Sequence, residues 1–148
     1  MPRPSGTAPR WELAEKEALT ARKIDADRTA PYSVLAAVYA TGERWPDLDA
    51  VLGEAEKKIP DNLSPYLRAS GTLLATGKDL ARAERYARKY LSQEPEPNST
   101  TPAVAHWRLG LILEKEGKKA EAVAELQTAT KLDPKFEQAQ KDLKRLKT

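Results

Sequence analysis

Residues that could perform acid–base, nucleophilic or metal chemistry are few and scattered in this 148-residue chain. The chain holds one histidine, His106, and no cysteine, so it offers neither a nucleophile–base pair nor a thiolate ligand. Its carboxylates are spread along solvated faces, whereas a metal site needs several ligands that converge. No glycine-rich phosphate loop follows a strand. The sequence therefore predicts a protein that is not an enzyme, with no catalytic residue, no metal and no cofactor.

Basic side chains gather near the C-terminus, at Lys135, Lys141, Lys144, Arg145 and Lys147. Cations at the end of a helix complement its macrodipole, and no aromatic residues alternate with them as they do in many nucleic-acid sites. The chain has 25 basic and 22 acidic residues, and this net charge of +3 is too small to indicate nucleic acid. No run approaches the roughly 18 apolar residues of a membrane span. The compartment stays open, either the cytoplasm or the cell envelope.

A period runs along the chain and is marked in two independent ways. A proline closes three long helical patterns, at Pro60, Pro95 and Pro134, which follow one another at similar steps. A small residue inside an apolar stripe keeps the same steps: Ala36, Gly71 and Gly110. Glycine inside a helix costs roughly 0.5 to 1 kcal/mol against alanine, so a second helix is expected to pack closely on Gly110.

Each period contains two stripes of apolar or small residues at helical spacing, separated by a glycine. The stripes of the last period are His106, Leu109, Gly110 and Leu113, then Ala122, Leu126 and Ala129, with Gly117 between them. The middle period has Leu67, Ser70, Gly71 and Leu74, then Ala83, Ala87 and Tyr90, around Gly77. The first has Tyr32, Leu35, Ala36 and Tyr39, then Leu48, Leu52 and Ala55, around Gly42. Each period is therefore predicted to be a helical hairpin.

This order of small and large residues, closed by a proline in a unit of about 34 residues, resembles the tetratricopeptide repeat (TPR). The period from Ala103 to Pro134 matches best, whereas Leu48 and Ser70 depart from the pattern. The resemblance implies an all-α fold, a right-handed α-solenoid of stacked antiparallel helix hairpins with about eight helices. The predicted organisation is a flexible tail at 1–10 and a single domain at 11–148. Its parts are a partial repeat at 11–27, repeats at 29–62, 63–96 and 103–134, a loop at 97–102 and a capping helix at 135–148.

The two ends of the predicted array differ. Trp11 and Trp45 lie one repeat length apart, and each introduces a second-helix pattern, so residues 11–27 are predicted to be a second helix without its hairpin mate. Its alanine face, Ala14, Ala18 and Ala21, could support self-association. The last segment carries Phe136, Ala139, Leu143 and Leu146 on one stripe among polar residues, as expected of a cap.

The resemblance also implies that the first helices line a concave groove for a protein or peptide partner. The candidate binding residues on that side are Arg68, Thr72, Trp107, Arg108, Leu111 and Lys115. Arg68 and Trp107 occupy equivalent places in successive repeats and are expected to be neighbours. Some family members clamp a C-terminal carboxylate with lysine and asparagine, but Ser33 and Ala37 stand at those places here, so that clamp is not expected.

The sequence leaves two functions open. The first is a non-catalytic scaffold that binds a peptide or helical segment in the groove, where tryptophan and arginine often dominate interface energies. The second is a structural spacer or terminal cap of a longer array, with the partner bound elsewhere. In that case Trp107 simply packs between units and the arginines are solvated.

Overall fold

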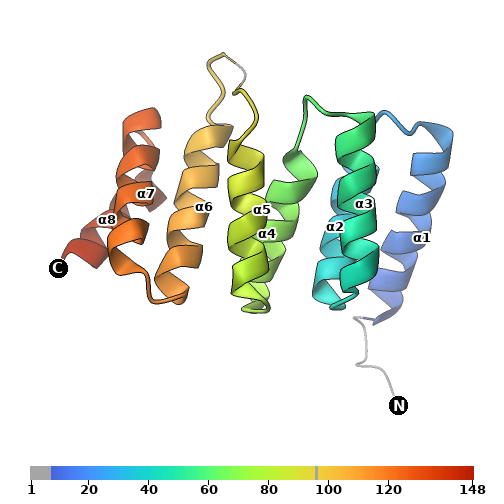
Figure 1. The fold of residues 1–148 in the computed structure, drawn as a ribbon, viewed down its shortest axis with the longest axis horizontal. Helices are drawn as coiled ribbons and strands as arrows, with labels where there is room; N and C mark the ends of the chain where they lie inside the picture. The colour runs from blue at the N-terminus through green and yellow to red at the C-terminus, as the bar shows by residue number, and fades with distance from the viewer. Residues whose placement is uncertain (1–7, 96) are drawn as a thin grey trace. The chain divides into compact units, whose positions relative to one another are not determined.

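The computed structural model describes residues 8–95 and 97–148, and in these ranges the chain forms eight α-helices and no strand (Figure 1). The helices are α1 (Ala8–Ile24), α2 (Thr29–Thr41), α3 (Trp45–Lys58), α4 (Ser64–Thr76), α5 (Leu80–Leu91), α6 (Thr101–Lys115), α7 (Lys119–Leu132) and α8 (Glu137–Lys147). The predicted all-α class and the number of helices are thus confirmed.

The chain divides into two compact units, and the boundary lies within α4, between Thr72 and Leu73. The first unit contains α1, α2, α3 and most of α4, and the second contains the end of α4 with α5 to α8. The prediction that residues 11–148 form a single domain stays a prediction.

Two helices begin earlier than the repeat pattern predicts. The first, α1, begins at Ala8, inside the predicted tail at 1–10, of which residues 1–7 lie outside the described residues. The other, α6, begins at Thr101, inside the predicted loop at 97–102. Both helices carry a proline at their second residue, Pro9 and Pro102. A proline is compatible with the first turn because the amide hydrogens there have no intrahelical acceptor.

Helix α2 is the centre of the first unit, where it packs against both α1 and α3. Its residues 35–40 are all buried, and Tyr32 and Leu35 are completely so. A helix with neighbours on several sides needs apolar residues around most of its circumference, which explains why the sequence from Leu35 to Ala40 is apolar throughout. Two ion pairs connect α1 to the start and the middle of α3: Glu15–Arg44 and Arg22–Glu54.

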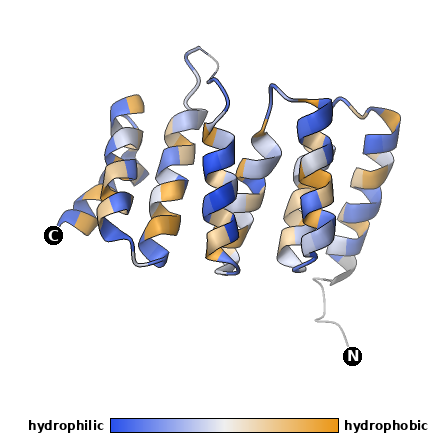
Figure 2. Cartoon of the chain, in the orientation of Figure 1, coloured by the Kyte–Doolittle hydropathy of each residue, from blue (hydrophilic) through white to orange (hydrophobic). Residues whose placement is uncertain are grey.

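In the second unit α6 packs on α5 and α7, and α7 packs in turn on α8. The fully buried side chains here include Leu109, Ile112 and Leu113 from α6 and Leu126 from α7. Apolar and polar residues share each helix in Figure 2, as expected where one face packs on a neighbour and another faces water. Leu109, Leu113 and Leu126 lie on the stripes predicted for the last hairpin, whereas Ile112 does not.

The close packing expected at Gly110 is confirmed. A Cβ atom on Gly110 would lie 3.0 Å from Leu126 Cγ and 3.2 Å from the Ala122 carbonyl oxygen, both on α7. The helices α6 and α7 are joined by residues 116–118 and run antiparallel (Figure 1). The cost of glycine in α6 is thus offset by close contact with α7.

The hairpin turns use left-handed residues, but not always the predicted glycine. Gly77 and Gly117 have φ of 71° and 83°, a conformation that favours glycine. In the first hairpin Gly42 has φ of −85°, and the left-handed residue is its neighbour Glu43, at 56°. Gly42 instead ends α2, where its amide donates to the carbonyl of Val38.

Candidate interaction surface

The six predicted binding residues fall into two groups. Arg68 and Thr72 lie on α4 within the first unit, where Arg68 is exposed and the Thr72 hydroxyl donates to the Arg68 carbonyl at 3.1 Å. The other four, Trp107, Arg108, Leu111 and Lys115, lie on α6 within the second unit. That Arg68 and Trp107 are neighbours stays a prediction.

Trp107 packs against the C-terminal helix. Its Nε1 donates to Asp142 Oδ2 at 2.7 Å, and its ring centroid lies 5.3 Å from that of Phe136, which caps α8. Asp142 is 8% exposed, so this hydrogen bond is largely shielded from water. Trp107 therefore holds α8 in place, and its ring is half-buried rather than free.

The sequence analysis did not predict that Asp142 accepts a hydrogen bond from another helix. The feature that could have indicated this is its position in α8, three residues after Ala139 and four before Leu146, which puts an acidic residue on the apolar stripe. A carboxylate on such a stripe needs a donor, because burying an unpaired charge is costly. Trp107 supplies that donor from α6.

Arg145 forms the second contact between α8 and α6. Its guanidinium donates to both oxygens of Glu114, at 2.5 and 2.9 Å, and to Asp142 Oδ1 at 3.4 Å. The Arg145 hydrogen bonds lower the pKa of Glu114. One of the five basic residues of the C-terminal segment is therefore committed to an ion pair within the second unit.

These contacts divide α6 into faces. Gly110 faces α7, whereas Trp107 and Glu114 face α8. Between the helices that pack on α6 lies a strip formed by Arg108, Leu111 and Lys115, which we call the α6 strip. Arg108 and Leu111 are half-buried and Lys115 is exposed.

The α6 strip joins one apolar side chain to two cations. Lys115 Nζ donates to the Leu74 carbonyl at 3.3 Å, which places the end of α4 beside the strip within the second unit. Such a surface can hold a carboxylate through the cations and an apolar side chain through Leu111.

His106 lies on the α6 stripe that faces α7. Its Nδ1 lies 2.6 Å from Glu125 Oε2, so the ring connects α6 to α7. In the described ranges no group of three His, Cys, Asp or Glu residues could hold a metal ion. Within the same ranges no helix is both long and apolar enough to cross a membrane.

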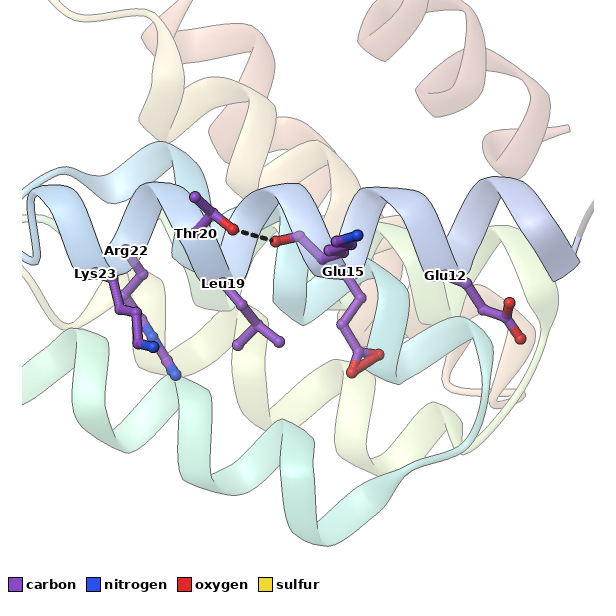
Figure 3. A pocket seen from close by; sticks show the side chains of 7 residues that line it. Glu12, Glu15, Leu19, Thr20, Arg22 and Lys23 are labelled. Carbon is purple, nitrogen blue, oxygen red and sulfur yellow. Dashed lines mark hydrogen bonds between the residues drawn. The ribbon is translucent and has the colours of Figure 1, made fainter.

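A hollow of about 470 Å³ lies along α1, on the face shown in Figure 3. Its lining mixes charges of both signs, and two of these, Glu15 and Arg22, are already paired with residues of α3 or its cap. Thr20 donates its hydroxyl to the Lys16 carbonyl at 3.0 Å, a local helix contact. Nothing in this set forms a nucleophile with its base.

Two carboxylates lie together between α5 and the turn that follows α6. Glu84 accepts from Arg88 at 2.9 Å and from Lys118 at 3.0 Å, and the Arg88 hydrogen bond is the largest cause that lowers the pKa of Glu84 to about 2. Burial raises the pKa of Glu116, and the neighbouring Glu84 raises it further. Glu116 Oε1 is buried, and no donor in the described part of the chain reaches it.

The contributions of Glu84 and Glu116 to the stability of the folded state change with pH in opposite directions. The lowered pKa of Glu84 favours the folded state above the ordinary value of 4.5, and this stability is lost as the pH falls toward 2. The raised pKa of Glu116 favours the folded state when the group is protonated, and this stability is lost as the pH rises through its folded pKa.

Glu116→Gln should therefore raise the free energy of unfolding at pH 7, by about 1 kcal/mol, since the amide removes a buried charge and can donate to Glu84. Urea denaturation at pH 7 and pH 5 measures the gain, which should shrink at pH 5 as Glu116 takes up a proton. Glu121→Gln, at an exposed position of α7, is the matched control and should change little. Equal or lower stability of Glu116→Gln at pH 7 would contradict this assignment.

Helices packed as consecutive hairpins with a small-residue seam define a TPR-like helical repeat protein. Solved structures with this fold include the two that follow. The crystal structure of MamA matches with a TM-score of 0.65 at 15% identity, over 99% of this chain and 84% of that one. The Arabidopsis OM64 TPR domain matches with a TM-score of 0.56 at 20% identity, over 95% of this chain and 97% of that one.

A comparison of the sequence with models of protein families identifies the family of this chain. The model of the family described as "T7SS, ESX-1 secretion system protein EccA1, N-terminal domain" matches residues 7–145, and the chain belongs to this family. No curated protein matches the chain significantly in sequence. The predicted TPR resemblance is thus confirmed, and TPR domains typically mediate interactions between proteins.

Proposed function

We propose that this chain is a non-catalytic interaction module that binds a segment of a partner protein through the second unit. The TPR-like fold and membership of the EccA1 N-terminal domain family support an interaction role. The scattered placement of ionisable residues gives no support to catalysis. Because the family description names the ESX-1 secretion system, we propose a partner that belongs to such a system.

The α6 strip carries the proposal. Its three residues come from one helix whose other faces are covered by α5, α7 and α8, so the helix is held rigidly while the strip meets solvent. A rigid surface loses little entropy when it binds. Trp107 contributes as the residue that positions α8 at one side of the strip, rather than as a free aromatic anchor.

The chemistry of the strip defines the class of ligand. Arg108 and Lys115 favour acidic side chains, and Leu111 between them favours one apolar side chain. We therefore propose an acidic peptide segment with an apolar residue among its carboxylates. Arg68 and Thr72 lie on α4 in the first unit, and their role as peptide contacts stays a separate proposal.

A peptide-display library screened against this protein tests the proposal. Acidic peptides with one apolar residue should be enriched, and the double variant Arg108→Glu, Leu111→Ser should lower their affinity at least about tenfold, since it replaces attraction by repulsion and removes the apolar contact. Lys131→Glu, which makes the same charge reversal at an exposed position of α7, is the control and should bind normally.

Peptides that bind the double variant as tightly as the original protein would reject the α6 strip. Enrichment of no peptide class at all would favour the alternative, a structural spacer or cap whose partner binds elsewhere. Circular dichroism of both variants confirms that a loss of binding does not follow from unfolding.

A further inference from the structure

Helix α1 carries the seam of a second helix, and within residues 8–95 and 97–148 no first helix covers it. Ala14, Ala18 and Ala21 stand one repeat length before Leu48, Leu52 and Ala55, which are buried on α3 at 2% exposure or less. In α1 the same positions line an open groove of about 430 Å³ against α2, with Ala30, Pro31 and Val34 on its other side. We call this the α1 groove.

Apolar side chains beside the groove are unusually exposed. Leu13 is 55% exposed and Ile24 is 81% exposed. Helical geometry makes both side chains project from α1 in nearly the same direction as Glu17, which lines the groove. A helix placed in the α1 groove would cover these side chains, as α2 covers the equivalent face of α3.

The C-terminal helix presents the opposite half of a hairpin. Gln140, Leu143, Lys144 and Lys147 stand one repeat length after His106, Leu109, Gly110 and Leu113, which form the stripe of α6 that meets α7. In α8 these positions line a groove of about 380 Å³ beside Thr130 of α7. We call this the α8 groove.

Helix α1 thus has the pattern of a second helix and α8 that of a first helix, and each lines an open groove. We propose that two copies of this chain associate head to tail, with α8 of one copy in the α1 groove of the next. The α1 helix of the next copy then fills the α8 groove, and the two helices complete one hairpin. The contact joins the second unit of one copy to the first unit of another.

The sizes of the side chains fit this pairing. The α1 seam is lined by alanines, whereas the α8 stripe carries the long side chains of Gln140, Lys144 and Lys147. Small residues opposite large ones already pack within the chain, where Gly110 meets Leu126. Lysine stems can cover apolar surface while the ammonium group reaches the edge of the contact.

The charges also fit, because the helices of a hairpin are antiparallel. The C-terminal half of α8 carries Lys144 and Lys147, and it would lie beside the part of the neighbouring α1 that carries Glu15 and Glu17. At the other end Glu137 would lie near Arg22 and Lys23.

Glu17 is the acidic residue best placed to meet α8. It lines the α1 groove, whereas Glu15 is paired with Arg44. Lys144 lines the α8 groove, whereas Arg145 is bound to Glu114. The Glu17–Lys144 pair is therefore the contact to test.

A head-to-tail contact uses two different surfaces, so it leaves one of each open on a dimer. Association should therefore continue beyond two copies as the concentration rises.

Sedimentation velocity over a concentration series of the full chain tests the proposal. The average mass should rise with concentration beyond that of a dimer, and added salt should weaken the association. Glu17→Lys and Lys144→Glu should each lower the association constant about tenfold, since each turns an attraction into a repulsion. Glu12→Lys, on the face of α1 shown in Figure 3, is the control and should associate normally.

The charge swap separates a direct contact from a general effect of charge. A chain with both Glu17→Lys and Lys144→Glu restores the pair in reverse. An equal mixture of the two single variants forms the original and the reversed pair in alternation, and both experiments should recover most of the association. A protein that stays monomeric at all concentrations would overturn the proposal. So would association that neither single variant weakens, or a loss that the double variant does not recover.

Discussion

Gly110→Leu is expected to lower the free energy of unfolding by about 3 kcal/mol, because it inserts a side chain where helices α6 and α7 already touch. A Cβ atom alone would meet Leu126 Cγ at 3.0 Å and the Ala122 carbonyl oxygen at 3.2 Å. The Leu126 side chain is completely buried and the carbonyl belongs to the backbone of α7, so neither can move away easily. Urea denaturation followed by circular dichroism measures the loss.

Gly53→Leu is the matched control. Gly53 also lies inside a helix, α3, but nothing lies within 4 Å of a Cβ atom there. Leucine should leave the stability unchanged or raise it by up to about 1 kcal/mol, since it favours helix more than glycine does. If the two variants lost equal stability, the close contact between α6 and α7 would not be what Gly110 provides.

Asp142→Ala has the next largest expected effect, a loss of about 2 kcal/mol, because it removes the acceptor of a shielded donor. The Trp107 Nε1 hydrogen would lose its partner at 2.7 Å, and Arg145 would lose one of its two carboxylate partners. The loss should appear as detachment of α8, measured by faster amide hydrogen exchange in residues 137–147 than in α6 or α7.

Lys141→Ala is the control for this variant, since Lys141 is exposed on the same helix one residue earlier. It should leave both stability and exchange in α8 nearly unchanged. Asp142→Asn offers a second comparison, since an amide oxygen can still accept from Trp107. If the amide hydrogens of α8 exchanged at the same rate in Asp142→Ala and Lys141→Ala, Asp142 would not be the residue that holds α8.

These contacts give α6 the central place in the second unit. Its small residue allows α7 to pack closely, its tryptophan and Glu114 hold α8, and the α6 strip is the proposed surface for a ligand. The proposed interaction surface and the proposed head-to-tail contact use different residues, so a variant in one should not disturb the other. Peptide binding by Glu17→Lys checks this independence.

The period of the sequence determined the helical hairpins and their seams. Residues at helical spacing, a glycine at each break and a proline at each end are local signals, because they act through backbone conformation and through the neighbouring turn. Gly110 shows that such local signals can also predict a contact between helices. The free-energy cost of glycine in a helix predicted that another helix packs closely on it, and the stripe at Ala122 and Leu126 indicated which helix that is.

The roles of the polar residues were decided by tertiary structure. No sequence pattern indicated that Asp142 and Phe136 lie against Trp107, a predicted binding residue, or that Arg145 pairs with Glu114. The partners of such groups lie on other helices, far away in sequence. Helical periodicity predicts which residues share a face of one helix. The pairing of long polar side chains depends also on how two helices are placed and rotated against each other, and only tertiary packing determines that.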